Sequence, residues 1–539
     1  MHASGQSVLL LLLLGMTAAP LLTKAEVFTS FQDLTAVFAL ERRVVAALHS
    51  YVGDMETRLA KIRKYLQEYE QVTAEGPATD EVIRERLAGN PVHAFHLMKR
   101  ITVDWRHLED QAKTDYWRGV VEAMRGSDTG GVVRLPKEED LQGAAQALVR
   151  LHDVYNLNMS QLVRGTVWGV ASAAEMTAQD CLYMGKHSFN LGMYPRALQW
   201  FEEAYTLAGL EGNATVTQEQ VNMFLNTAIK AYDESIAAQY EREAQEEQEA
   251  VFGASIPVDD MKSSRQTSKY RLGVDLKPHE DAVNFQALCR GEQLLSESYL
   301  ATLSCFYDHR DDRYLRLMPA KVERLHWRPE LLIFHDVLSQ AEIEKIKFLA
   351  RPMLARAMVQ GSKGKGNTVS NTRTSSVGWL DDSLHPLVDK VGDRIQRLTG
   401  LSTNLARDDA ELLQVSNYGV GGHYNPHHDY LLADKTEKEL LHNIHPRELV
   451  MGDRIATFMF YLSDVNRGGA TAFPRLGTAV WPTKGSAVFW YNLKRSGEAD
   501  EATLHGACPV VHGHKWVGNK WIRERGQFLR RRCGLHPDD

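Results

Sequence analysis

The segment from Gly421 to Tyr430 constrains the fold more than any other part of the chain, because it contains a His-x-Asp pair, His427 and Asp429. In an extended strand, residues two apart point to the same side, so both side chains can reach one metal ion while His428 points away. A distant third ligand would complete a facial set of two histidines and one carboxylate, which leaves coordination positions open and suits non-haem Fe(II). His505 is the candidate for that third ligand.

Other histidines compete for the same role, since a short motif such as His-x-Asp is a weak signal by itself. The competing residues are His423, His428, His512 and His514.

Lys515 lies ten residues after His505 and is a compact cation that can pair with the far carboxylate of a bound dicarboxylic acid such as 2-oxoglutarate. Because such a pair would be buried, each charge needs the other.

Short runs rich in β-forming residues surround the His-x-Asp pair and are separated by Gly, Pro and Asn turns. These runs are residues 411–418, 454–462, 486–491 and 515–521. Many short strands of this kind are typical of a barrel or a jelly roll. The sequence therefore places the candidate metal ligands in a β-domain.

The C-terminal part of the chain resembles the catalytic domain of the collagen prolyl 4-hydroxylase alpha subunits, a family of Fe(II)- and 2-oxoglutarate-dependent dioxygenases. The runs that carry the resemblance are NYGVGGHYNPHHD, GDRIATFMFYLSDVNRGGATAFP, KGSAVFWYNL, HGACP and KWVGNKWIRERGQ. The resemblance implies a double-stranded β-helix with flanking helices, in which His427, Asp429 and His505 hold Fe(II) and Lys515 binds the distal carboxylate of 2-oxoglutarate. It also implies O2 as a cosubstrate, L-ascorbate as a cofactor, and C4 of proline in X-Pro-Gly sequences of collagen-like chains as the target.

The same resemblance concerns two aromatic residues and the partners of the chain. Tyr418 and Trp521 match positions that line the cosubstrate and substrate pocket, although both could equally be ordinary aromatic residues of the barrel core. The family pairs with protein disulfide isomerase, which implies an α2β2 assembly in the lumen of the endoplasmic reticulum. No KDEL-like signal ends the sequence, so we expect retention there to depend on that partner.

Length and composition allow several domains and exclude one class of partner. The chain has 539 residues, of which 44% are hydrophobic and 24% charged, as in ordinary globular proteins. Its net charge of -7 gives no electrostatic case for nucleic-acid binding. Residues 1–25 carry an apolar run and then small residues, which is typical of a cleaved secretory signal, with a disordered start as the alternative. No later stretch is long and apolar enough to cross a membrane.

Five cysteines and two glycosylation sequons fit a secretory compartment. The sequons begin at Asn158 and Asn213. The residues alone leave the disulfide pairing open. The family resemblance implies the pairs Cys289–Cys305 and Cys508–Cys533, with Cys181 as a buried thiol.

Residues 26–140 are expected to form a helical coiled-coil region for dimerisation. A heptad repeat begins at Phe31 and ends at Tyr69, and every a and d position except Glu41 is apolar or aromatic. Such a seam favours a coiled coil that joins two chains, and an amphipathic helix packed on its own domain is the alternative. The resemblance continues through residues 90–100 and favours dimerisation.

Residues 141–245 are expected to form a tetratricopeptide-like helical domain. From Thr177 small and large residues alternate as in a tetratricopeptide hairpin with Gly192 at the turn, and a second, less regular hairpin is expected from Gln218 to about Tyr240. In the family this domain binds proline-rich peptides in the polyproline II form through tyrosines. The available tyrosines are Tyr183, Tyr194, Tyr205, Tyr232 and Tyr240, with helix packing as their alternative role.

Residues 246–325 are expected to be a linker with a disulfide, and residues 326–539 to be the catalytic domain. A helix within it should begin at the capping box formed by Ser339 and Glu342. Two polar segments are typical of loops, namely 363–373, expected to be mobile near the active site, and the insertion 435–448, to which we assign no function.

Three other functions fit parts of the sequence. A zinc hydrolase could use the same three ligands, but the chain has no HExxH motif and Lys515 would have no role there. A non-catalytic scaffold could use only the helical regions, and a dioxygenase could act on a proline-rich secreted protein other than collagen. The complete ligand set with Lys515 favours a dioxygenase.

Overall fold

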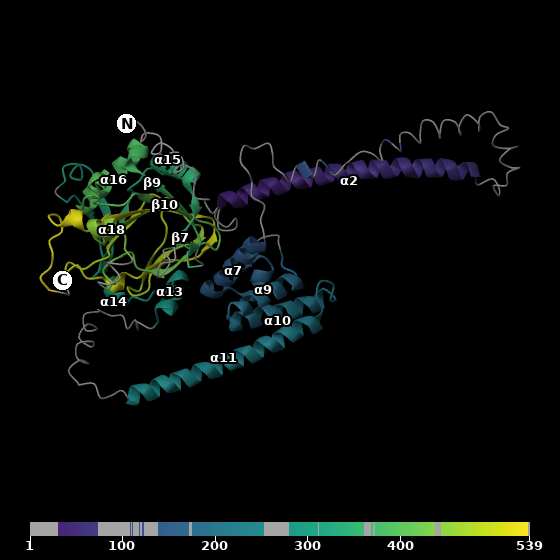
Figure 1. Ribbon diagram of the computed structural model, residues 1–539, viewed down its shortest axis with the longest axis horizontal. Coiled ribbons are helices and arrows are strands. Elements are labelled where there is room, and N and C mark those ends of the chain that lie inside the picture. The colour runs from purple at the N-terminus through teal and green to yellow at the C-terminus, as the bar shows by residue number, and fades with distance from the viewer. Residues whose placement is uncertain are drawn as a thin grey trace, which may run out of the picture. The chain divides into compact units, whose positions relative to one another are not determined.

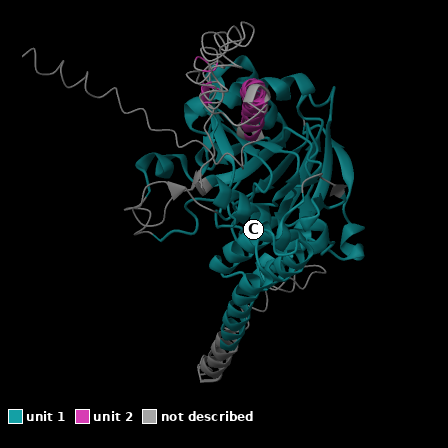
Figure 2. Ribbon diagram, turned by 90° about the vertical axis from the view of Figure 1, so that its right-hand side faces the viewer, with its two compact units in different colours: residues 1–31, 136–539 teal, residues 32–135 magenta. Residues whose placement is uncertain are grey.

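The computed structural model of the protein describes most of the chain. The described residues are 31–73, 138–171, 175–252, 280–310, 312–359, 368–369, 372–436 and 444–536, with the isolated positions 108, 110, 118 and 121–122. The chain divides into two compact units, one formed by Gln32–Leu135 and the other by the remaining residues (Figure 2). The expected signal at residues 1–25 lies outside the described residues. None of the described helices combines the length and hydrophobicity needed to cross a membrane.

The smaller unit contains the long helix α2 (Phe31–Thr73). One stripe of its apolar side chains recurs every seven residues, and each of these side chains is at least 44% exposed: Phe38, Val45, Val52, Leu59 and Leu66. A regular apolar stripe that stays open to solvent is the surface that a second helix covers in a coiled coil. The coiled coil itself stays a prediction.

The larger unit begins with helices and one short hairpin. Its elements are α7 (Glu138–Tyr155), α8 (Met159–Val163), β1 (Thr166–Val167), β2 (Val170–Ala171), α9 (Ala178–Asn190), α10 (Tyr194–Leu210) and α11 (Gln218–Phe252). A capping box between Thr177 and Asp180 starts α9. Gly192 adopts a φ of 74°, which glycine tolerates without strain, and turns the chain into α10. The expected first hairpin is therefore present.

The expected second hairpin is wrong, because α11 is a single helix of 35 residues. No glycine or proline occurs between Gln218 and Phe252, so nothing in this stretch interrupts the helical backbone. The described structure thus shows three consecutive helices, α9, α10 and α11, instead of two helical hairpins.

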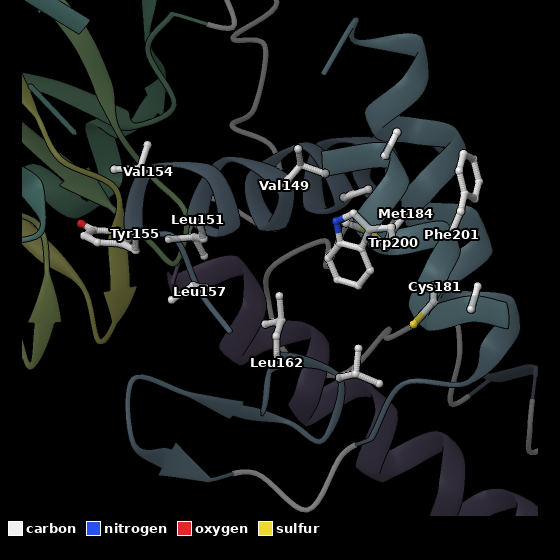
Figure 3. Close-up of a cluster of buried hydrophobic side chains, with 14 of the residues drawn as sticks. Val149, Leu151, Val154, Tyr155, Leu157, Leu162, Cys181, Met184, Trp200 and Phe201 are labelled. Atoms are coloured by element: carbon white, nitrogen blue, oxygen red, sulfur yellow. The ribbon is translucent and has the colours of Figure 1, made fainter. Parts of the chain in front are cut away.

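The helices share one buried core (Figure 3). Trp200 and Phe201 of α10 pack against α7 and α9, and the contact is so close that a Cβ on Gly185 would lie 2.5 Å from the Phe201 ring. At the end of α7, the Tyr155 hydroxyl donates a 2.5 Å hydrogen bond to the carbonyl of Pro509. The same core continues into residues of the β-domain, so the helices and that domain share buried surface.

His152 is completely buried in this helical core. Neither ring nitrogen has a hydrogen-bond partner among the described residues, and the ring meets Trp200 edge-on with 5.7 Å between centroids. Burial, together with the positive charge of Arg196, lowers the pKa of His152 from 6.5 to about 4. The folded protein therefore holds this side chain neutral at pH values where the unfolded chain protonates it.

We expect the free energy of unfolding to fall as the pH drops from about 6.5 to about 4, because the unfolded chain then binds a proton that folded His152 refuses. The pKa difference corresponds to a loss of up to about 3 kcal/mol. Urea unfolding of the protein and of His152→Leu at pH 7 and pH 4.5 measures this contribution. The variant should lose that part of the pH dependence, and an identical pH dependence in both proteins would contradict the assignment.

The β-domain consists of two antiparallel sheets (Figure 1). The nine-stranded sheet has the order β3 (Cys305–Asp308), β4 (Ala320–Trp327), β5 (Glu330–His335), β16 (Ala487–Tyr491), β12 (Arg454–Tyr461), β19 (Lys515–Arg523), β10 (Leu413–Tyr418), β9 (Ser376–Leu380) and β6 (Ala355–Arg356). The four-stranded sheet has the order β11 (Tyr424–His427), β17 (His505–Ala507), β14 (Thr471–Phe473) and β15 (Thr478–Val480). Two small pairs are β7 (Met358–Val359) with β8 (Thr368–Val369), and β13 (Arg467–Gly468) with β18 (Val510–His512).

Strand periodicity divides the core of the β-domain into two layers. On β5, Leu332 and Phe334 pack on the side covered by α15 (Gln340–Ala350) and α16 (Pro386–Thr399), whereas Leu331 and Ile333 pack on the side of the four-stranded sheet. The predicted capping box between Ser339 and Glu342 starts α15. Three further helices are α13 (Asp281–Cys289), α14 (Glu297–Leu300) and α18 (Pro446–Met451). A helical N-terminal part followed by an antiparallel β-domain agrees with the coarse fold expected from the sequence.

The expected linker over residues 246–325 is only partly right. Residues 253–279 lie outside the described residues, but residues 280–325 contain α13, α14, β3 and the start of β4. β3 and β4 pair at the edge of the nine-stranded sheet, so they belong to the β-domain. The polar composition of the preceding stretch concealed this boundary.

The expected disulfide pairs are wrong as well. The structure joins Cys289, the last residue of α13, to Cys508, and the two Cα atoms are 5.5 Å apart. Cys181 is a buried free thiol as expected, and Cys305 and Cys533 are exposed free thiols. Proximity in sequence does not decide pairing, because a disulfide requires Cα atoms within about 7 Å of each other in the folded chain.

The packing of α13 explains why Cys289 meets Cys508. Phe285 of α13 lies against β17, where a Cβ on Gly506 would come within 2.8 Å of its ring. Asp281 of the same helix forms a 2.9 Å ion pair with Arg475. These two contacts place the end of α13 beside the end of β17.

We expect the double variant Cys289→Ser/Cys508→Ser to unfold more easily than the parent protein, because this disulfide closes a loop of 219 residues in the unfolded chain. The loss should be about 2–5 kcal/mol. Thermal unfolding with and without a reductant checks this, and the matched control Cys305→Ser/Cys533→Ser should behave as the parent. A stability loss in the control instead would restore the pairs that the sequence suggested.

Candidate active site

Two paired strands bring the candidate metal ligands together. β11 and β17 are in register with His427 directly opposite His505, and Asp429 follows just after the end of β11. Nε2 of His427 lies 3.8 Å from Oδ1 of Asp429, and Nε2 of His505 lies 3.7 Å from Oδ2. All three ligand atoms fall within 4.8 Å of one another, and within the described ranges no other group of His, Cys, Asp and Glu does so.

Backbone carbonyls fix which imidazole nitrogen faces a metal. Nδ1 of His427 lies 2.9 Å from the carbonyl oxygen of Asn425, and Nδ1 of His505 lies 2.9 Å from that of Thr503. A carbonyl can only accept a hydrogen bond, so both Nδ1 atoms carry the hydrogen. Each Nε2 therefore keeps a lone pair directed to the cluster, as a metal ligand requires.

The electrostatics of the cluster favour the deprotonated forms that bind metals. Burial alone would raise the pKa of Asp429, but His505, His427 and Arg454 outweigh burial and lower it to about 2. Burial and the neighbouring His505 lower the pKa of His427 to about 3. At neutral pH the site thus offers a carboxylate and a neutral imidazole without competition from protons.

The competing histidines lie elsewhere. Nε2 of His428 is 3.1 Å from the carbonyl of Glu501, which takes this ring away from Asp429. His423 is buried with Nδ1 2.7 Å from the Thr374 hydroxyl, and His512 is exposed on β18. The structure therefore brings together the predicted set and none of these rivals.

Lys515 is a buried amine that lacks an anionic partner among the described residues. It is 1% exposed, and its Nζ donates to the Thr471 hydroxyl at 3.1 Å and lies 3.5 Å from the carbonyl of Ala470. In the described part of the chain no carboxylate is close enough to contribute to its pKa. Burial lowers the pKa of Lys515 to about 7. An anionic ligand would stabilise its charged form, so this residue fits the carboxylate of 2-oxoglutarate.

Both predicted aromatic residues line the same cavity as Lys515 and the ligand cluster. Tyr418 faces Lys515 across β10 and β19, and its ring centroid is 5.9 Å from Nζ. Trp521 lies an even number of residues after Lys515 on β19. Because side chains alternate between the two faces of a strand, both point to the same face. Both side chains are also at least 94% buried, so each belongs to the core of the β-domain and lines the cavity at the same time. Their role in binding stays a prediction.

The sequence did not reveal Arg373, which lines the cavity too. It ends the segment that we expected to be a mobile loop, and most of that segment lies outside the described residues. Arg373 itself is 7% exposed and donates to Ser375, Gln414 and Ser416 at 3.1 to 3.2 Å. Its burial depends on its contacts with Gln414 and Ser416 of β10 in the folded chain, and no pattern in the polar segment indicates it.

A second missed residue, Asp453, organises the turn that follows Asp429. Its carboxylate accepts the backbone N–H groups of Leu431, Leu432 and Ala433 at 2.6 to 2.9 Å. The insertion 435–448 begins just after this turn, and its residues 437–443 lie outside the described residues. Asp453 thereby fixes the backbone between the ligand and the insertion.

Comparison with known proteins agrees with this geometry. Residues 30–169 match the family model "Prolyl 4-Hydroxylase alpha-subunit, N-terminal region", and residues 413–523 match the 2OG-Fe(II) oxygenase superfamily. Prolyl 4-hydroxylase subunit alpha-2 of Gallus gallus is 36% identical over 95% of this chain and 96% of its own length, and subunit alpha-1 of Rattus norvegicus is 36% identical over 94% and 95%. The solved 2OG complex of a viral collagen prolyl hydroxylase from Paramecium Bursaria Chlorella virus-1 is 26% identical, covers 36% of this chain and 95% of its own, and has a TM-score of 0.27. On the strength of the full-length relatives, this chain belongs to the prolyl 4-hydroxylase alpha-subunit family and carries a 2OG-Fe(II) oxygenase domain.

Proposed function

We propose that the chain is the catalytic alpha subunit of a procollagen-proline 4-dioxygenase that hydroxylates proline in X-Pro-Gly sequences of collagen-like chains. The observation that carries this proposal is one cavity lined both by the His427–Asp429–His505 cluster and by the buried Lys515, which has no carboxylate partner among the described residues. An enzyme of this kind needs a site for Fe(II) beside a site for a dicarboxylate, and these side chains would supply both. Family membership supports the choice of proline as the target.

Bound Fe(II) supplies the oxidising chemistry, in which O2 converts 2-oxoglutarate to succinate and CO2 and places its other oxygen atom in a substrate C–H bond. The contribution of the chain is positioning and exclusion of water. His427, Asp429 and His505 would hold the metal, and Lys515 would bind the distal carboxylate of 2-oxoglutarate. Apolar walls such as Met459, which is 7% exposed, keep water from the reacting atoms.

The helical part of the larger unit is proposed to hold the proline-rich substrate as a tetratricopeptide-like domain. Three of its candidate tyrosines, Tyr183, Tyr194 and Tyr232, are half-buried, and Tyr205 is 40% exposed. Their rings are thus anchored by packing but still offer a face to a ligand, as aromatic residues that bind polyproline II chains do. Tyr240 lies where side chains are outside the description.

The proposed assembly is an α2β2 tetramer with protein disulfide isomerase in the lumen of the endoplasmic reticulum, with L-ascorbate as the accompanying reductant. The exposed heptad stripe of α2 supports the contact between two alpha chains. The disulfide between Cys289 and Cys508 supports an oxidising compartment.

The proposal is tested with the full chain co-expressed with protein disulfide isomerase. The protein is incubated with Fe(II), 2-oxoglutarate, ascorbate and a (Pro-Pro-Gly) repeat peptide. Mass spectrometry should then show about 16 Da added to each modified proline before glycine, which corresponds to one oxygen atom. A peptide with alanine at that position is the matched control. Turnover of 2-oxoglutarate without peptide modification would favour another proline-rich substrate, and no turnover at all would favour a non-catalytic scaffold.

A further inference from the structure

Another cavity, which we call the tryptophan groove, lies where the helical part of the larger unit meets the β-domain. Its volume is about 400 Å³, and its lining residues are Trp168, Val465, Asn466, Arg467, Gly468 and Trp481. Trp168 belongs to the turn between β1 and β2, and the other five residues come from the β-domain. Ligand sites are frequent at such junctions, and none of these residues lines the cavity of the ligand cluster.

Trp168 occupies a backbone position that tryptophan rarely adopts. In the two-residue turn of the hairpin, Trp168 has a φ of 51° and Gly169 a φ of 78°. Such a turn favours the sequence Asn-Gly, and a bulky side chain at its first position is strained. The indole packs on the ring of Tyr155 with 4.8 Å between centroids, and Tyr155 is itself bonded to the carbonyl of Pro509. A strained residue that its surroundings hold in place is a pointer to function.

The side chains of the groove offer donors that have no acceptor. Trp481 is 43% exposed, and both indoles and the guanidinium of Arg467 can only donate hydrogen bonds. Within the described part of the chain, none of these three side chains donates a hydrogen bond or joins an ion pair. The groove therefore suits a ligand that presents flat apolar groups together with carbonyl acceptors.

A proline-rich chain has this chemistry. Proline has no N–H group, and its ring packs well on aromatic faces. In the polyproline II form the backbone makes no internal hydrogen bonds, so its carbonyl oxygens remain free to accept from indole and guanidinium groups. We infer that the tryptophan groove binds a proline-rich segment of the substrate at a distance from the proline that is hydroxylated. This inference rests on the proposed function, which supplies a proline-rich substrate.

Two short connections join the groove to the active site. Gly468 ends β13, and three residues later Thr471 begins β14 and accepts the hydrogen bond from Lys515. β18 pairs with β13 and follows β17, which carries His505. One long peptide can therefore occupy the groove and the active site together, which strengthens its binding without any change at the reacting atoms.

The test compares two peptides of different length, using the full chain co-expressed with protein disulfide isomerase. A (Pro-Pro-Gly) peptide of two repeats extends over about 19 Å and is too short to gain from a second site, whereas ten repeats extend over about 90 Å. Trp168→Asn removes the indole but gives the turn its favoured Asn-Gly sequence, so the fold should be retained. This variant should raise the KM for the long peptide about 10-fold and leave its kcat and the KM for the short peptide unchanged. Trp481→Ala should have the same effect.

Trp327→Ala is the matched control, because Trp327 is 44% exposed on β4 and does not line the groove. It should behave as the parent with both peptides. An unchanged KM for the long peptide in Trp168→Asn and Trp481→Ala would overturn the inference, and so would an equal rise for both peptides. A crystal structure with the long peptide in which a sugar chain or a second copy of the protein fills the groove would overturn it too.

Calorimetric binding of the long peptide without iron separates this inference from the proposed function. If the parent binds the peptide and both groove variants bind it about 10-fold more weakly, but no proline is hydroxylated, the proposed function fails and the inference holds. If the parent hydroxylates the peptide and both variants bind it as the parent does, the inference alone fails. If the parent neither binds nor hydroxylates the peptide, both fail.

Discussion

His505→Ala is expected to lose Fe(II) binding and 2-oxoglutarate turnover together. His505 is 5% exposed, lies opposite His427 on paired strands, and presents Nε2 to Asp429 at 3.7 Å. Alanine leaves only two ligands, so we expect the affinity for Fe(II) to fall by more than about 100-fold, beyond the loss typical of residues that only support a ligand. Anaerobic reconstitution with Fe(II), followed by measurement of bound iron and of succinate release, checks both effects.

His512→Ala is the matched control for this experiment. His512 is one of the rival histidines of the sequence, but it is exposed on β18 and does not belong to the cluster. Its replacement should leave bound iron and succinate release unchanged. Loss of iron in the control together with retention in His505→Ala would place the metal elsewhere.

Lys515→Met is expected to raise the KM for 2-oxoglutarate by at least about 30-fold, because one partner of a buried charge pair is removed. Methionine keeps most of the length of the side chain and none of its charge. The sharper readout is selectivity between 2-oxoglutarate and 2-oxopentanoate, which lacks the distal carboxylate. The parent should strongly prefer 2-oxoglutarate and the variant should not, whereas an unchanged preference would remove Lys515 from the binding site.

The same residue predicts a pH dependence with a definite sign. Burial lowers the pKa of Lys515 to about 7, so above pH 7 the amine is mostly neutral and must take up a proton to bind the dicarboxylate. The apparent Kd for 2-oxoglutarate should therefore rise about tenfold per pH unit above 7 and level off below it. Lys515→Met should show no such rise, which a binding titration between pH 6 and pH 9 measures.

The sequence predicted the parts of the fold that depend on local periodicity. Runs rich in β-forming residues, separated by turn residues, predicted β10, β12, β16 and β19, and the alternation of side chains along a strand places Lys515 and Trp521 on one face of β19. The His-x-Asp spacing and the position of His505 led to the three side chains that the structure brings within 4.8 Å of one another. The strand faces and the His427–Asp429 pair follow from short-range geometry, whereas His505 meets them through the long-range pairing of β11 with β17 and was assigned through the family resemblance.

The features that the sequence did not predict depend on contacts between distant segments. Cys289 pairs with Cys508 because α13 packs on β17, and no spacing between cysteines shows that contact. Arg373 is a polar residue that becomes part of the site only when the folded chain brings it against Gln414. The tetratricopeptide analogy also suggested a break within α11, although its residues contain no signal for one.

Labelling with ¹⁸O2 tests the central claim most directly. The full chain, co-expressed with protein disulfide isomerase, is incubated under ¹⁸O2 with a (Pro-Pro-Gly) repeat peptide, Fe(II) and 2-oxoglutarate. Succinate and the peptide are then analysed by mass spectrometry. The proposed reaction predicts one labelled oxygen in succinate and one in each hydroxyproline, in equal amounts. Hydroxyproline whose oxygen comes from water, or succinate that forms at the same rate without peptide, would contradict it.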